Sequence, residues 1–151
     1  MLNANKGKSK KIDGSKMKIG VVVSQFNSNI TEPMLKGALE TLQENKVKKE
    51  NIRTVWVPGS FEIPLACQRL AKSKKYDALV AIGCVIKGET DHYYYICNEA
   101  SRGVMDVMLE YDIPIGFGVL TTQNLKQAQV RSRGKENKGR EAAEAVLAMI
   151  K

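Results

Sequence analysis

Hydrophobic residues gather in short uninterrupted runs, separated by longer stretches in which they recur three or four positions apart. The runs are residues 18–23, 52–57, 78–86 and 113–119. Because the apolar residues within each run are mostly consecutive rather than alternating with polar ones, the runs predict strands buried on both faces of a sheet.

The stretches between the runs have the spacing of amphipathic helices. Asn29 or Thr31 is the expected N-cap of the first helix, with Pro33 in its first turn. The predicted helices cover about 30–42, 61–71, 93–109, 124–131 and 137–150.

The alternation of strands and helices predicts an α/β fold with a parallel sheet covered by helices on both faces. Right-handed crossovers leave few topologies. The commonest small one is a single three-layer, flavodoxin-like domain whose four strands lie in the order 2-1-3-4. A further strand could be added from the N-terminus. No internal repeat or second domain is visible.

This topology brings three unusual loops to one place. Ligands bind at the carboxyl ends of strands where the strand order reverses, here between the first and third strands. We expect a cleft lined by residues 24–27 and 87–92, with the loop 58–62 beside it. This convergence, rather than any one motif, predicts the functional site.

His92 is the only histidine of the chain and follows the third apolar run. Imidazole has an ordinary pKa close to neutrality, so it can both donate and accept a proton. A histidine that merely caps a helix is the alternative interpretation.

A chain of 151 residues with 43% hydrophobic residues is long enough for one domain with a substantial core. Its longest apolar run is too short to cross a bilayer, and its N-terminus lacks the features of a secretory signal. Cys67, Cys84 and Cys97 are odd in number and widely spaced, which favours reduced thiols in a cytoplasmic protein. Since their spacing suits no metal, we expect no metal site.

The net charge of +8 is concentrated at the N-terminus, where residues 1–18 hold six lysines and one aspartate. We predict a basic, flexible tail over residues 1–16 and a folded domain over residues 17–151. No basic patch with interleaved aromatic residues follows, so nucleic-acid binding is not expected.

Three loop features allow two interpretations each. Phe26 is either a minor core contact or a platform for a flat ring. The segment 58–64 is either a simple turn into a helix or a loop whose amides hold a hydroxylated chain or an anion. The segment 87–91 precedes a helix and could form an anion-binding nest, although Glu89 and Asp91 would repel a phosphate if they faced it.

Two side-chain clusters also remain open. The basic cluster could supply a cation for a phosphate, or could be a solvated linker. Tyr93, Tyr94 and Tyr95 favour helix packing or a subunit contact over a cofactor site. The basic cluster consists of Arg131, Arg133, Lys135 and Lys138.

In chain order, several motifs resemble one family, 6,7-dimethyl-8-ribityllumazine synthase, over about residues 18–149. They are Ser-Gln-Phe-Asn at 24–27, Pro-Gly-Ser-Phe-Glu-Ile-Pro at 58–64, Gly-Cys-Val-Ile-Lys-Gly-Glu-Thr-Asp-His at 83–92, Asn-Glu-Ala-Ser at 98–101, Phe-Gly-Val-Leu-Thr-Thr at 117–122 and Asn-Lys-Gly at 137–139.

The resemblance implies condensation of 5-amino-6-ribitylaminouracil with 3,4-dihydroxy-2-butanone 4-phosphate, releasing water and phosphate, without a metal or organic cofactor. His92 matches the proton-transfer histidine, and Phe26 the residue that stacks on the pyrimidine. Ser60, Phe61 and Glu62 match residues that hold the ribityl chain, and Val85 and Ile86 match residues that meet the ring through their backbone. Gly88, Glu89 and Thr90 match the phosphate site, with Arg131 as its cation. Phe117 and Lys138 match residues that a neighbouring subunit contributes.

The sequence departs from the family pattern near the histidine. Tyr94 stands where an acidic residue is frequent. Lys87, which the resemblance implies as a further substrate-binding residue, stands where arginine is frequent, and this loses bidentate geometry. Acidic residues at positions 89 and 91 replace smaller or neutral ones.

The resemblance also implies a homo-oligomer, either a pentamer or a shell of twelve pentamers. The short segment 132–136 is compatible with the shell, since insertions between the last two helices tend to prevent its closure. Two alternatives remain: an archaeal-type riboflavin synthase on the same scaffold, and a non-catalytic flavin- or nucleotide-binding shell protein.

Overall fold

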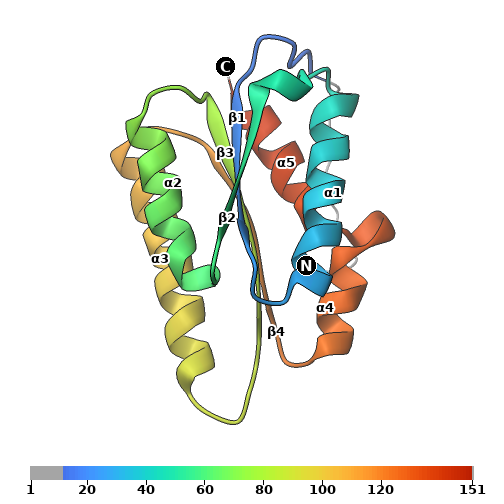
Figure 1. Ribbon diagram of the computed structural model, residues 1–151, viewed down its shortest axis with the longest axis vertical. Helices are drawn as coiled ribbons and strands as arrows, with labels where there is room; N and C mark the ends of the chain where they lie inside the picture. The colour runs from blue at the N-terminus through green and yellow to red at the C-terminus, as the bar shows by residue number, and fades with distance from the viewer. Residues whose placement is uncertain (1–11, 151) are drawn as a thin grey trace.

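The computed structural model describes residues 12–150 as a parallel four-stranded sheet between two layers of helices (Figure 1). The strands lie in the order β2-β1-β3-β4, which confirms the predicted order. Their bounds are Ile19–Ser24 for β1, Ile52–Val57 for β2, Ala78–Ile86 for β3 and Ile115–Thr122 for β4.

The two central strands, β1 and β3, are the most apolar. Every residue of β1 is buried, and so is β3 as far as Cys84. The β1–β3 pairing runs from Ile19 opposite Ala78 to Val23 opposite Ile82, so that β3 continues beyond the end of β1. The last residues of β3 therefore have no neighbouring strand on the side where β1 has already ended.

The helices divide between the two faces of the sheet. Helices α2 and α3 cover one face, and α1, α4 and α5 cover the other (Figure 1). Separate apolar clusters fill the two layers, one including Met34 and Leu147 and the other including Ile63 and Val104. The helices are α1 at Ser28–Glu44, α2 at Ile63–Lys72, α3 at His92–Glu110, α4 at Leu125–Ser132 and α5 at Lys138–Met149.

Two predicted boundaries are wrong. The fourth strand covers 115–122 rather than 113–119, because pairing with β3 continues to Ile86 opposite Thr122. The first helix begins at Ser28, and its N-cap Asn27 makes no side-chain capping hydrogen bond. Pro33 consequently lies in the second turn rather than the first.

Residues 12–16, which the sequence analysis assigned to the tail, contact the end of α1. The Gly14 amide donates to the Asn45 carbonyl at 2.7 Å, and the Ile12 amide to Asn45 Oδ1 at 3.0 Å. Residues 12–16 contain no strand, and the rest of the predicted tail, 1–11, lies outside the described residues, as does 151. No helix within residues 12–150 has both the length and the apolar character that a membrane span requires.

Candidate functional site

A cleft of about 700 Å³ opens where β1 and β3 end. It brings together most of the predicted site residues from three separate loops. Its lining consists of Phe26, Asn27, Gly59, Ser60, Phe61, Glu62, Cys84, Val85, Ile86, Gly88, Thr90, His92, Tyr93, Tyr95 and Ile96.

Phe26 lies on the wall of this cleft that follows β1. Its side chain is 70% exposed, so the interpretation as a core contact is wrong. Its amide donates to the Pro58 carbonyl at 3.0 Å, which ties this loop to the loop after β2. An aromatic face held by its backbone and open to solvent can stack on a planar ring.

Asn27 anchors the same loop to β3, a role that the sequence did not reveal. Its Nδ2 donates to the carbonyl of Cys84 at 2.9 Å. Cys84 lies beyond Ile82, the last partner of β1, so the Asn27 amide takes the place of a strand hydrogen bond. The backbone of Asn27 is left-handed, with φ 60°, a conformation that asparagine tolerates better than most residues.

The loop after β2 presents a carboxylate and a hydroxyl to the cleft. The Gly59 amide donates to Glu62 Oε2 at 2.8 Å, which fixes the position of the carboxylate. Ser60 is buried, and its Oγ has no hydrogen-bond partner within the described chain. This hydroxyl lies against the backbone of β3, because a Cβ added at Gly83 would come within 2.6 Å of it.

His92 is the first residue of α3, and its exposed side chain lines the cleft. In the loop before it, the amides of Gly88, Glu89 and Thr90 make no hydrogen bond within residues 12–150. The N-cap Asp91 makes no side-chain capping hydrogen bond either. These free N–H groups beside a helix N-terminus can bind an anion.

Helix α3 contributes more to the cleft than the sequence predicted. Tyr93, Tyr95 and Ile96 line it. Tyr93 is also buried, as the packing interpretation required, whereas Tyr95 is 67% exposed. The sequence signal was the triple tyrosine itself, which does not reveal the direction of each ring.

Lys87 and Glu89 belong to the loop that precedes α3, but their side chains do not line the cleft. Lys87 Nζ instead donates a hydrogen bond of 2.8 Å to the hydroxyl of Tyr94 and lies 5.0 Å from the centre of its ring. This hydrogen bond is the first cause of a raised pKa of Lys87.

Phe117, Arg131 and Lys138 line a different hollow of about 400 Å³, formed by β4, α4 and α5. Arg131 Nη1 donates to the Gln127 carbonyl at 3.0 Å, and Lys138 pairs with Glu141. The structure therefore does not place these predicted site residues around the cleft of His92 within one chain.

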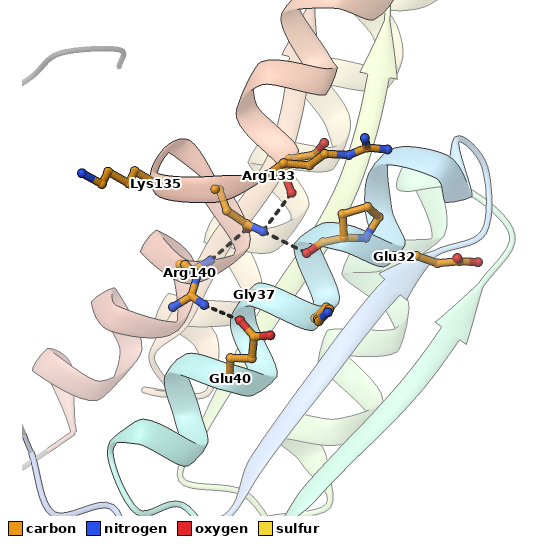
Figure 2. Close-up of a pocket in the computed structure, with 11 residues that line it drawn as sticks. Glu32, Gly37, Glu40, Arg133, Lys135 and Arg140 are labelled. Atoms are coloured by element: carbon orange, nitrogen blue, oxygen red, sulfur yellow. Dashed lines mark hydrogen bonds and ion pairs between the residues drawn. The ribbon is translucent and has the colours of Figure 1, made fainter.

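Another hollow, of about 840 Å³, lies elsewhere, between α1 and the connection of α4 to α5 (Figure 2). Its central side chain, Asn137, is buried and donates to the carbonyls of Pro33 and Ser132. Arg140 pairs with Glu40 across it. These polar groups already have partners within the protein, and the hollow lies away from the carboxyl ends of the strands. We therefore assign the functional site to the cleft lined by His92.

The three cysteines, Cys67, Cys84 and Cys97, are free thiols. Burial raises the pKa of Cys67 and of Cys84 to about 12, and also raises the pKa of Cys97. Within residues 12–150, no group of three histidine, cysteine or acidic residues is placed to hold a metal ion.

Comparison with known proteins places the chain in a family. Residues 16–151 match the family model described as 6,7-dimethyl-8-ribityllumazine synthase. The chain is 53% identical over 138 residues to 6,7-dimethyl-8-ribityllumazine synthase from Coxiella burnetii strain Dugway 5J108-111, with 91% of each chain covered. Relatives of the same name from C. burnetii strains CbuG_Q212 and RSA 493 / Nine Mile phase I have the same identity and coverage.

Proposed function

The chain belongs to the 6,7-dimethyl-8-ribityllumazine synthase family, and from this membership we propose the reaction that it catalyses. It is a transferase that condenses 5-amino-6-ribitylaminouracil with 3,4-dihydroxy-2-butanone 4-phosphate, a step of riboflavin biosynthesis. The family match favours this reaction over the riboflavin synthase alternative.

The observation that carries the proposal is the meeting of Phe26, Glu62 and His92 at one cleft. The three residues come from three loops, and the reaction needs a ring platform, a partner for hydroxyls and a proton carrier. In this proposal Phe26 stacks on the pyrimidine. Ser60, Phe61 and Glu62 hold the ribityl chain, while the backbone of Val85 and Ile86 meets the ring edge.

The chemistry needs proximity and proton transfer. The 5-amino group attacks the ketone, and a first water leaves to form an imine. Phosphate is then eliminated, and the ribitylamino nitrogen closes the ring on the carbonyl that results, with loss of a second water. Holding two substrates together supplies several kcal/mol, on the order of 7 or more in favourable cases. We assign His92 the proton transfers, which typically contribute about 10²- to 10⁴-fold to the rate.

The phosphate is proposed to bind at the loop before α3. The free amides of Gly88, Glu89 and Thr90 provide donors, and Gly88 leaves open space around them. A doubly charged phosphate also needs a cation. We propose Arg131 for that role, supplied together with Phe117 and Lys138 by a neighbouring copy.

A shared site requires an oligomer, and we propose a pentamer, with a shell of twelve pentamers as its larger form. The support is the division of the predicted site residues between the cleft of His92 and the hollow of Arg131. Thr122 Oγ1 in that hollow is buried without a hydrogen-bond partner within the described chain. We also propose a cytoplasmic location, which the free thiols support.

The activity is tested by mixing both substrates and following phosphate release and lumazine fluorescence together. We expect both signals to appear in equal amounts. Binding without phosphate release would refute the enzyme and favour a non-catalytic flavin-binding protein. Consumption of added lumazine with formation of riboflavin would favour the riboflavin synthase alternative.

The shared site is tested by complementation between two impaired variants, His92→Ala and Arg131→Ala. Each is assayed alone, then both are refolded together so that subunits mix. If one subunit supplies the histidine and its neighbour the arginine, mixed oligomers contain some intact sites and activity rises above that of either variant. Activity that never exceeds the average of the two variants would contradict a shared site.

A further inference from the structure

Lys87 and Tyr94 face each other across the loop that leads from β3 into α3. Lys87 is the first residue after β3, and Tyr94 lies in the first turn of α3. Nζ of Lys87 donates a hydrogen bond of 2.8 Å to the Tyr94 hydroxyl and lies 5.0 Å from the centre of the ring.

Both ends of this contact are fixed to the fold. The Lys87 amide donates to the Thr122 carbonyl of β4 at 2.8 Å. The Tyr94 ring packs edge-on against Tyr93, with centroids 5.4 Å apart and planes at 82°, and Tyr93 is buried in the cleft wall. The contact therefore joins the end of the sheet to the wall of the cleft.

The residues between these two ends make few contacts of their own, apart from Asp91, whose carbonyl accepts the Tyr94 amide at 3.0 Å. Gly88, Glu89, Thr90 and Asp91 are all exposed, and none donates or accepts a side-chain hydrogen bond within residues 12–150. A loop with so few contacts loses conformational entropy when it closes on a ligand. A link across its ends reduces that loss in advance.

We propose that Lys87 and Tyr94 form a clasp that positions residues 88–91 for the phosphate of the substrate. In this role Lys87 is a positioning residue rather than a substrate ligand. The inference rests on the proposed function, since it concerns the phosphate subsite of the same cleft.

A double-mutant cycle separates the clasp from a direct contact between Lys87 and phosphate. The variants are Lys87→Met, Tyr94→Phe and the double variant, with steady-state kinetics measured for each substrate in turn. Tyr94→Phe removes the hydroxyl and keeps the ring. We expect each single variant to raise KM for the butanone phosphate roughly two- to tenfold, the range for one hydrogen bond.

The proposed clasp predicts two further results in the same kinetic measurements. The double variant should be little worse than Lys87→Met alone, because either change breaks the same contact. The KM for the ribityl pyrimidine should stay within twofold, and kcat should fall less than KM rises. A second measurement, competitive inhibition by inorganic phosphate, should weaken in parallel with KM for the butanone phosphate.

Conservative and control variants complete the test. Lys87→Arg retains donors and should recover most of the affinity. Tyr111→Phe, at the far end of α3, and Lys75→Met, on an exposed loop, should behave as wild type. Wild-type kinetics for Tyr94→Phe, or strictly additive effects, would overturn the clasp. Absence of turnover in the wild-type protein would instead overturn the proposed function.

Discussion

The hydrogen bond of Asn27 permits two substitutions that both remove the side-chain donor and that differ in how the backbone tolerates the left-handed conformation. Its φ is 60°, and its Nδ2 donates to the Cys84 carbonyl at 2.9 Å. Asn27→Gly removes the hydrogen bond and keeps the left-handed backbone without strain. Asn27→Ala removes the same hydrogen bond and places a Cβ in a backbone conformation that alanine rarely adopts.

The magnitudes follow from these two effects. A hydrogen bond of this kind contributes about 0.5–1.5 kcal/mol, and the Cys84 carbonyl borders the cleft, where water can replace the lost donor. We therefore expect Asn27→Gly to lower the free energy of unfolding by about 1 kcal/mol. The left-handed conformation costs alanine roughly 1–2 kcal/mol more, so Asn27→Ala should lose about 2–3 kcal/mol in total.

Urea unfolding at one fixed protein concentration measures both values, because assembly makes stability concentration-dependent. Asn98, exposed within α3, is the matched control. There the alanine variant should be the more stable of the two, because glycine in a helix is about 1 kcal/mol less favourable than alanine. Both Asn27 variants should also raise KM for the ribityl pyrimidine, because the loop of Phe26 loses its tie to β3. An alanine variant as stable as the glycine variant would refute the reasoning.

Three further changes test the site and the core. His92→Ala should lower kcat by about 10²- to 10⁴-fold and leave measurable lumazine formation, whereas complete loss with substrate binding intact would mean that the imidazole does more than transfer protons. Gly83→Ala places a Cβ 2.6 Å from Ser60 Oγ and 2.9 Å from Ile63 Cδ1, so urea unfolding should show a loss of about 1–3 kcal/mol. The pKa of Cys67 is raised from 9.0 to about 12, so the stability due to its neutral form is complete below pH 9.0 and is lost as pH rises toward 12. Cys67→Ala should remove this slope, about 1.4 kcal/mol per pH unit, and an unchanged slope would contradict it.

The order of the strands was predictable because two simple rules determine it. Consecutive apolar residues in 78–86 require a strand covered on both faces, and right-handed crossovers then limit the topology. The end of β4 was not predictable in this way. Thr121 and Thr122 are polar, and they extend the strand because Val85 and Ile86 of β3 pair with them.

The start of α1 shows the same limit on local reasoning. Asn29 and Thr31 are good capping residues, but Thr31 Oγ1 donates to the Ser24 carbonyl inside the fold instead. The helix begins earlier because Asn27 adopts φ 60° and its carbonyl accepts the amides of Ile30 and Thr31. The start of the helix therefore depends on the tertiary contact of Asn27 with β3, which a local capping pattern does not reveal.

The cleft was predictable from topology, whereas the directions of its side chains were not. The strand-end rule brought Phe26, Glu62 and His92 together without knowledge of any contact. Whether Lys87 faces the cleft or turns away depends on a partner seven residues later, Tyr94, in another element. Lys87 and Tyr94 lie in two different elements, and only the fold makes them neighbours.

The proposed phosphate subsite carries charges of both signs. The loop supplies free amides at residues 88–90 but also carries Glu89 and Asp91, whose charges disfavour an anion. Lys87, held at the loop by Tyr94, offsets part of that charge without lining the cleft. The remaining cation has to come from elsewhere, and Arg131 lines a hollow on β4, α4 and α5. Under the proposed function, in which a neighbouring copy supplies Arg131, we therefore predict that a dissociated subunit binds the pyrimidine better than the butanone phosphate.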